Sequence, residues 1–214
     1  GGSTPVADVT FDDVTANDNY PQYGCPNNFF RRGIFFQSMP MTNIVVENGE
    51  FRRNGIGGID LNGGLAGGAF VTGAIIRNNV VEGGTGGIDG TDAGIALVEP
   101  TADPSYPVLI ENNDITMTGR FGIEIKGGVG NGAESGNGSF VIQNNTITGN
   151  FGAVTFPCGT PLGGIDRDLG GIVLGAINGS RSPEGVVIKG NNVSGIRQNT
   201  CNTTPDPDRS TGFG

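Results

Sequence analysis

The residues best suited to acid–base chemistry lie close together in one stretch, with a further carboxylate upstream. Arg120, Glu124 and Lys126 stand in "GRFGIEIK", and Asp60 stands in the similar phrase "GGIDLN". A Lys or Arg base with a second cation can remove a proton beside a carboxylate and stabilise the charge that develops. Two carboxylates about 5–10 Å apart can instead hydrolyse a glycosidic bond. The competing interpretation is that these side chains form only a solvated, charged surface.

A second candidate is a calcium site in "GGTGGIDGTDAG", residues 83–94. Asp89 and Asp92 could ligate Ca²⁺ together with backbone carbonyls, since calcium prefers oxygen ligands. The phrase occurs once and places its Asp one position later than the calcium-binding nonapeptide does. No other cofactor is indicated, because the chain contains no His, which is the commonest general base and a usual transition-metal ligand.

The composition narrows the classes of partner. The chain has 214 residues, 41 of them Gly, and a net charge of −9. An acidic chain without a basic patch is not expected to bind nucleic acid. No apolar run approaches the ~20 residues that span a bilayer. The first residues, "GGSTPVADV", do not resemble a signal peptide, so we expect that a leader has been removed or that the chain belongs to a longer protein.

Covalent modification is only weakly indicated. The Cys residues permit at most one intrachain disulfide. Cys158 and Cys201 are the preferred pair over Cys25, because both lie in irregular segments flanked by Pro or Asn. In an Asn-rich chain, N-x-[S/T] sequons are weak evidence of glycosylation. They occur at Asn137, Asn144, Asn178, Asn192 and Asn202.

The elements that must position the candidate residues follow from a repeated phrase. Stretches such as "FVIQNNTITGNFG" (140–152) and "AIIRNNVVEGG" (74–84) place an Asn pair after a short apolar run. Alignment on this pair produces vertical columns. The inward apolar column is Val46, Ile76, Ile110, Ile142 and Ile188. The first Asn column is Asn48, Asn78, Asn112, Asn144 and, in place of Asn, Gly190. The second is Gly49, Asn79, Asn113, Asn145 and Asn191.

A second phrase, G-[I/A]-x-[L/I/T], predicts another strand in each repeat. It occurs as "GIFF" (33–36), "GIDL" (58–61), "GIAL" (94–97), "GIEI" (122–125), "GAVT" (152–155) and "GIVL" (171–174). Period-two alternation turns its apolar residues inward as core pairs. These pairs are Ile59/Leu61, Ile95/Leu97, Ile123/Ile125 and Ile172/Leu174. Asp60 and Glu124 should then point outward from one column.

Short strands repeated in a fixed order predict a solenoid, in which each repeat buries its apolar face against the next. We expect parallel strands stacked ~4.8 Å apart. Asn tolerates the left-handed backbone needed at a corner, and stacked Asn amides can hydrogen-bond from coil to coil. Asn144 is therefore expected to be a buried rung that is not glycosylated. The alternative, an antiparallel sandwich of hairpins, would not keep the phrases in a fixed order.

These phrases resemble the repeats of right-handed parallel β-helix proteins of the pectate-lyase-like superfamily, over about residues 33–196. The resemblance implies an all-β, right-handed parallel β-helix solenoid of about five to seven coils, with three short strands per coil and irregular terminal caps. Residues 1–32 and 197–214 would be cap or flanking segments. The superfamily generally binds linear polysaccharide in a groove beside a sheet, and the long insertions after the G-I strand would wall such a groove.

Two outward columns suggest contacts along the side of the solenoid. One would form a ladder of charges between coils: Glu47, Arg77, Glu111, Gln143 and Lys189. The other would form an aliphatic stripe: Val45, Ile75, Leu109, Val141 and Val187. Either β-propensity alone placed the stripe there, or a loop, another subunit or the rest of a longer chain covers it.

We therefore expect an extracellular or cell-surface, non-catalytic module of surface, fibre or adhesion type that binds glycan or neighbouring subunits along its side. The chain lacks the Gly-His-Gly phrase of polygalacturonases and the Asp-Pro-His-Glu phrase of alginate epimerases, which favours this expectation. The alternative is a polysaccharide lyase, epimerase or hydrolase that acts in a groove beside the G-I strand face, with Lys126, Arg120, Glu124 and Asp60 as catalytic residues.

Overall fold

The computed structural model of the chain contains only β-strands among the residues it describes. These are residues 5–19, 32–55, 57–63, 70–82, 93–117, 121–127, 129–130, 139–149, 170–175 and 185–196. Every strand pairing within them is parallel. The predicted all-β class and the parallel pairing are therefore confirmed for this part of the chain.

The strands form three sheets, which we name A, B and C. Sheet A contains β1 (Val6–Asp12), β3 (Met41–Glu47), β6 (Val71–Arg77), β10 (Val108–Glu111), β14 (Phe140–Gln143) and β17 (Val186–Lys189), in that order. The short strands β9 (Pro100–Ala102) and β13 (Val129–Gly130) extend it beside β6. Sheet B contains β4 (Glu50–Phe51), β7 (Val80–Glu82), β11 (Asp114–Met117), β15 (Thr146–Gly149) and β18 (Asn192–Ser194). Sheet C contains β2 (Arg32–Gln37), β5 (Gly57–Asn62), β8 (Ala93–Val98), β12 (Phe121–Lys126) and β16 (Gly170–Gly175).

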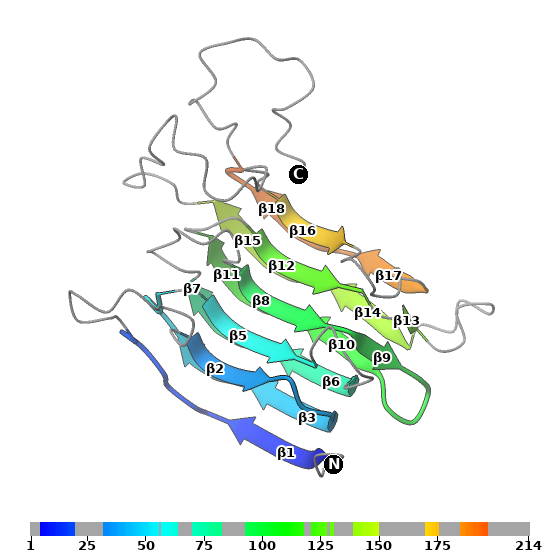
Figure 1. Cartoon of the computed structure of the whole chain (residues 1–214). Helices are drawn as coiled ribbons and strands as arrows, with labels where there is room; N and C mark the ends of the chain where they lie inside the picture. Colours follow the sequence, from blue (N-terminus) through cyan, green and yellow to red (C-terminus); the bar gives the residue numbers. More distant parts are fainter. Residues whose placement is uncertain are drawn as a thin grey trace, which may run out of the picture.

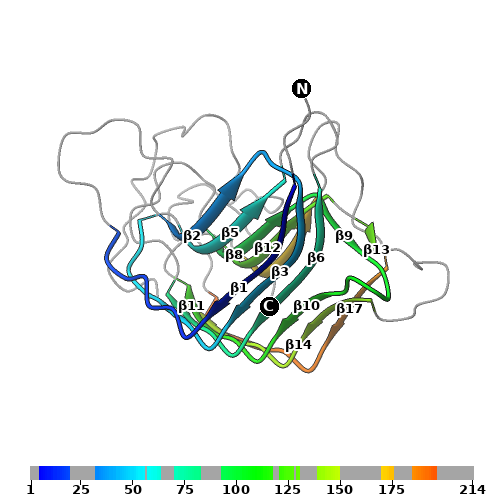
Figure 2. The same cartoon turned by 90° about the horizontal axis from the view of Figure 1, so that it is seen from below.

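The chain visits sheets A, B and C in turn and then returns to sheet A one strand further along. We call one such circuit a coil. Figure 1 shows the coils stacked from β1 in blue to β17 and β18 in orange, and Figure 2 shows the stack from below, with β1 and β3 in front of the later strands. This arrangement is consistent with a parallel β-solenoid.

The interior of the stack is apolar, and the predicted core pairs lie within it. Ile59, Leu61, Ile95, Leu97, Ile123 and Ile125 are all fully buried. Val46, Ile76, Ile110 and Ile142 of sheet A are also fully buried. The final coil differs, because Leu174 is 41% and Ile188 46% exposed. Among the described residues no strand pairs with the far side of β16 or β17, which explains this exposure.

The Gly of the G-I phrase is required by close packing at the corner between sheets B and C. A Cβ at Gly94 would lie 2.8 Å from Ile115 Cγ2, and a Cβ at Gly122 would lie 2.6 Å from Ile147 Cγ2. Real Cβ atoms essentially never come so close to another heavy atom. The phrase thus combines a Gly that admits the neighbouring sheet's side chain with inward apolar residues that fill the core.

The Asn pair performs two tasks at the corner between sheets A and B. The first column, Asn48, Asn78, Asn112 and Asn144, has positive φ angles of 58°, 56°, 54° and 55°. The second column is buried, with Asn79, Asn113 and Asn145 each 1% exposed. Its amides are joined from coil to coil, because Asn79 Nδ2 donates to Asn113 Oδ1 (3.0 Å) and Asn113 Nδ2 donates to Asn145 Oδ1 (2.9 Å). The predicted Asn ladder is confirmed.

The position expected for Asn144 was wrong. Its side chain is exposed, and Asn145 is the buried rung. The reason is that the residue that turns the backbone points outward while its successor points inward. Burial of the side chain therefore provides no argument against glycosylation at Asn144.

Several other expectations fall at the margins of the described chain. Residues 5–19, within the expected flanking segment 1–32, contribute β1, which pairs in register with β3, and Thr15 forms a bridge with Glu50. The phrase "GAVT" (152–155) lies outside the described residues, and β12 pairs directly with β16. All the Cys residues and segment 197–214 also lie outside them.

Candidate functional site

The outer face of sheet C carries the predicted carboxylates in one column. Asp60 on β5 is in register with Ala96 on β8, and Ala96 with Glu124 on β12. The two acids are therefore two strand spacings apart, which places their Cα atoms about 9–10 Å from one another. Only a methyl group stands between them. All three residues are buried, at 6%, 6% and 7% exposure.

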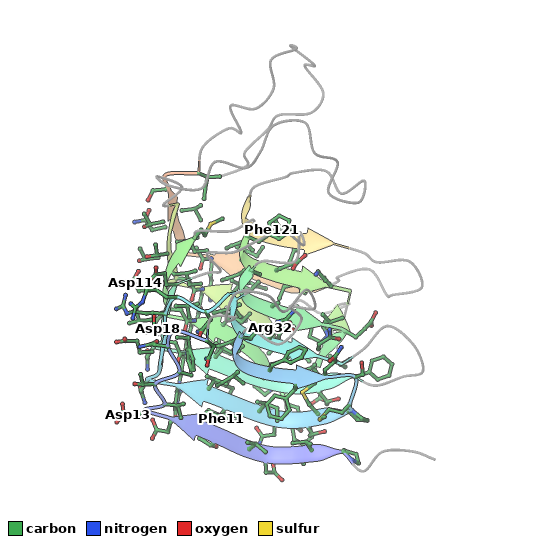
Figure 3. The ribbon with its side chains drawn as sticks, turned by 60° about the vertical axis from the view of Figure 1, so that its left-hand side comes forward. Phe11, Asp13, Asp18, Arg32, Asp114 and Phe121 are labelled. Atoms are coloured by element: carbon green, nitrogen blue, oxygen red, sulfur yellow. The ribbon has the colours of Figure 1, made fainter. Side chains whose placement is uncertain are left out.

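Arg32, at the beginning of β2, binds Asp60. Its Nε lies 2.5 Å from Asp60 Oδ2, and both side chains are 9% exposed. The guanidinium also lies over the ring of Phe35, with Cζ 4.3 Å from the ring centroid. Figure 3 labels Arg32 and Phe121, which both begin strands of sheet C and lie one above the other along the stack. Arg32 thus holds Asp60 from the neighbouring coil.

Lys126 binds the second carboxylate from its own strand. Lys126 Nζ lies 3.0 Å from Glu124 Oε2, and the Lys and Glu side chains are 22% and 9% exposed. The side chains alternate along β12, so these two residues share the outer face. Arg120, the remaining predicted cation, lies outside the described residues. The structure therefore brings together Asp60, Glu124 and Lys126, and adds Arg32.

The protonation of Asp60 is governed mainly by burial. Burial raises the pKa of Asp60 from 3.8 to about 6, with Glu124 acting in the same direction, while Arg32 and Lys126 lower it. Asp60 Oδ1 has no hydrogen-bond partner among the described residues, so Arg32 satisfies only one carboxylate oxygen. The result is an acid that changes charge near pH 6 although it is ion-paired.

This arrangement has two chemical consequences. Two cations and two carboxylates give the site no net charge when all four are ionised, and each carboxylate has a cationic neighbour. A neutral Asp60 next to an ionised Glu124 would also be the pairing that acid–base hydrolysis of a glycosidic bond requires. For proton abstraction by Lys126, the amine would first have to leave Glu124.

An apolar cluster adjoins this charged group. Ala93, Ala96 and Phe121 are buried together on the same face, and Val173 packs against them. Ala96 on β8 and Val173 on β16 are in register with Glu124 on β12, and Ala93 on β8 is in register with Phe121 on β12. Apolar residues are thus interspersed with the charged ones on this face, because Ala96 separates the two acids and Phe121 lies on the same strand as Glu124. This limits how far a continuous row of polar subsites could extend.

Sequence reasoning missed Arg32, although a signal was present. Arg32 directly precedes "GIFF", the phrase that places β2 beside β5. Because the ion pair with Asp60 crosses from the start of one strand to the middle of the next, a column-by-column alignment does not reveal it. The extended side chain of Arg makes this diagonal contact.

The described residues contain no group of three or more His, Cys, Asp or Glu side chains that could hold a metal ion. The predicted calcium ligands Asp89 and Asp92 lie outside those residues. The insertion at 98–107 is described. It forms β9 beside β6 and then a turn in which Asp103 Oδ1 accepts hydrogen bonds from the backbone N–H groups of Ser105 and Tyr106.

The outer face of sheet A carries the predicted ladder of charges. Arg77 Nε lies 2.6 Å from Glu47 Oε2, and Gln143 Nε2 donates to Glu111 Oε2 over 2.7 Å. The aliphatic stripe beside it is in register from β3 to β17. Val45, Ile75, Leu109 and Val187 are half-buried, and Val141 is 9% exposed.

The part of the chain that the structure describes contains no helix with the length and hydrophobicity that a membrane crossing requires. Comparison of the whole chain with known family models, curated proteins and solved structures found no match.

Proposed function

We propose that the chain is a right-handed parallel β-helix of the pectate-lyase-like type, displayed outside the cell, and that it is a non-catalytic module. It would bind glycan or neighbouring subunits along its side. The observation that carries this proposal is the aliphatic stripe on sheet A, which is aligned through successive coils and faces away from the core. Outward apolar residues repeated in this manner are typical of a covered surface.

The charged group on sheet C adds support. Asp60 is bound by Arg32, and Glu124 by Lys126. Largely buried charges paired with one another are a common structural arrangement in proteins without catalytic function at that site. The absence of His from the chain removes the most frequent general base.

The experiment is a combined binding and turnover assay. The purified chain is incubated with polyuronates and neutral polysaccharides, and its retention on each insoluble polymer is measured beside its mass by sedimentation. Release of unsaturated uronate is followed by ultraviolet absorbance. We expect retention or self-association without turnover. A chain that is neither retained on any polymer nor self-associated would contradict the proposal. Turnover that is abolished by Lys126→Ala would contradict it as well.

A second candidate function, glycoside hydrolysis, rests on Asp60. Its raised pKa of about 6 and its position two coils from Glu124 suit a general acid facing a carboxylate. In that case Asp60→Asn and Glu124→Gln would each abolish release of reducing ends, while Asn62→Ala on the same strand would not. Absence of any reducing-end release from a panel of linear polysaccharides would count against this candidate.

A further inference from the structure

The outer face of sheet A has a definite order of charges along the stack. One aligned column, which we call the charge column, runs Asp12, Glu47, Arg77, Glu111, Gln143 and Lys189. The aliphatic stripe runs beside it and is continued by Thr10 on β1. The charge column thus begins with an acid on the first described strand and ends with a cation on the last strand of sheet A.

The charge column is only partly neutralised by the other residues that the structure describes. Arg77 binds Glu47, and Gln143 binds Glu111. Asp12 accepts a hydrogen bond from Asn48 Nδ2 over 2.8 Å. The Arg77 side chain is still 41% exposed, and Asp12 and Lys189 are exposed. The exposed side chains of Asp12, Arg77 and Lys189 can therefore form ion pairs with groups of opposite charge on a partner.

This order is complementary to itself when it is reversed. A two-fold axis parallel to the strands keeps each column opposite the same column of a second copy but reverses the coil order. Asp12 then faces Lys189, Glu47 faces Gln143, and Arg77 faces Glu111, so that no like charges meet. A shift of one coil in one direction places Arg77 against Arg77, and a shift in the other places Glu111 against Glu111. Shifts of two coils likewise place Asp12 against Glu111 or Arg77 against Lys189. Among registers in which at least four strands of each copy overlap, only the unshifted one avoids such repulsion.

We propose that two copies of this chain pack through the outer faces of their A sheets, related by this two-fold axis, with their stacks antiparallel. Such an isologous contact presents the same surface from both copies. The aliphatic stripes meet at the centre, with Ile75 of one copy beside Leu109 of the other, and the charge columns form the rim. The inference rests on the proposed function, because it specifies which neighbouring subunit binds and where.

The size of the face agrees with a dimer of modest affinity. Six coils at ~4.8 Å extend about 24 Å along the stack, and six residues of strand extend about 20 Å across it. The contact would bury about 1,000 Å² in total, which is at the lower end of specific interfaces. An apolar centre with a charged rim is the usual composition of such contacts.

The decisive experiment uses two variants that repel themselves but attract each other. Arg77→Glu places a Glu opposite Glu111 of its own second copy, and Glu111→Arg places an Arg opposite Arg77. In a mixture, the introduced Glu of one variant faces the introduced Arg of the other, and the native Glu111 of the first faces the native Arg77 of the second. Sedimentation equilibrium should show self-association at least tenfold weaker for each variant alone and heterodimers of near wild-type affinity in the mixture.

Loss of fold cannot imitate this result, because a misfolded variant is not restored by mixing. Leu109→Thr, which places a polar but strand-compatible β-branched residue in the stripe, provides a second test and should also weaken the dimer. The control is Asp114→Lys on the outer face of sheet B, which should leave the mass distribution unchanged.

Other outcomes separate this inference from the proposed function. A wild-type chain that stays monomeric up to its solubility limit overturns the dimer, as does a mixture that fails to associate. A wild-type dimer that tolerates both charge reversals uses another face, so the inference fails while subunit binding stands. Retention on a polysaccharide by a monomeric chain likewise overturns the dimer and leaves the proposed function intact.

Discussion

At the scale of single residues, Asp60 shows how burial and ion pairing compete. A neighbouring guanidinium normally lowers the pKa of an Asp, but here burial outweighs it and the pKa rises to about 6. The folded protein therefore binds a proton between about pH 4 and pH 6 that the unfolded chain has released. Protonated Asp60 therefore adds to the free energy of unfolding. This contribution is fully present below about pH 4 and is lost as the pH rises through about 6.

Replacing Asp60 by Asn should remove this dependence on pH. A shift of about two units corresponds to about 3 kcal/mol, so the free energy of unfolding of wild type relative to Asp60→Asn should fall by about 2–3 kcal/mol from pH 4 to pH 7. Urea denaturation of both proteins across that range measures the difference. Asn62→Ala, a neutral change on the same strand, should alter stability by the same amount at every pH. A constant difference for Asp60→Asn would show that the carboxyl does not titrate in this range.

The candidate site could be predicted in part from the sequence. Period-two alternation placed Asp60 and Glu124 in one outward column, and the structure has them in register through Ala96. The ion pair of Asp60 with Arg32 could not be found in this way. Alternation fixes which face a side chain occupies. A long side chain such as that of Arg32, however, reaches a partner on the adjacent strand that is not directly opposite it. Spacing alone also carries no information on burial, which decides the pKa.

At the scale of elements, each corner of a coil depends on a specific residue type. The corner between sheets A and B needs one residue with positive φ and one buried amide, and consecutive Asn residues meet these two needs. The corner between sheets B and C needs a residue without a side chain, which is Gly. These requirements explain why the Asn pair and the G-I phrase recur, while the residues between them vary.

The two Asn columns should respond very differently to substitution. Asn113→Ala removes the bond of Nδ2 to Ile76 O and those that join it to Asn79 and Asn145, leaving buried groups unpaired. We expect a loss of about 3–4 kcal/mol, at about 1–3 kcal/mol for each unsatisfied group. Asn112→Ala should cost only about 1 kcal/mol, the strain of a left-handed backbone, and Asn112→Gly close to nothing. Chemical denaturation measures all three, and equal losses at both positions would contradict this assignment of roles.

Close packing at Gly122 can be tested by adding one methyl group. A Cβ there would lie 2.6 Å from Ile147 Cγ2 and from Gly171 O, so Gly122→Ala should destabilise by about 1–3 kcal/mol. At Gly175, on the next strand of sheet C, a Cβ would meet nothing within 4 Å. Gly175→Ala should therefore have little effect. Thermal unfolding of the two variants compares them directly, and a harmless Gly122→Ala would mean that the corner can widen.

The repeat was predictable at this scale because its corners constrain residue type. The inward apolar column was found by alignment on the Asn pair, and its members from Val46 to Ile142 are buried as predicted. Alignment erred where one residue type serves two purposes, so that Asn144 was assigned the burial that belongs to Asn145. Where the period lengthens, the strand beside β12 carries "GIVL", while "GAVT" lies outside the described residues.

At the scale of the whole molecule, stability is distributed along the stack. Each coil contacts only its neighbours, as in other repeat proteins, so a core residue in the middle is enclosed from both sides. Ile110 and Ile188 occupy the same column, yet Ile110 is fully buried and Ile188 is 46% exposed. Their environments differ only in position along the axis.

This difference predicts a gradient in the cost of truncation. Ile110→Ala should destabilise by about 2–5 kcal/mol, as for other fully buried Ile residues. Ile188→Ala should cost about 1 kcal/mol or less, because nearly half of its surface already contacts water. Equilibrium unfolding in urea gives both values. Losses of equal size would indicate that the last coil is covered as well as the middle one.

The two ends of the described stack are electrically unlike, because different charged residues lie in the first and last coils. The first described coil carries Asp8, Asp12, Asp13 and Asp18, and Figure 3 shows Asp13 at the β1 end. In residues 185–196 the charged side chain is Lys189. The amides of the Asn ladder add to this asymmetry, since each donates toward the next coil. A body with such a lengthwise dipole turns in a field. On a positively charged support it should therefore stand upright on its β1 end, with its long faces free.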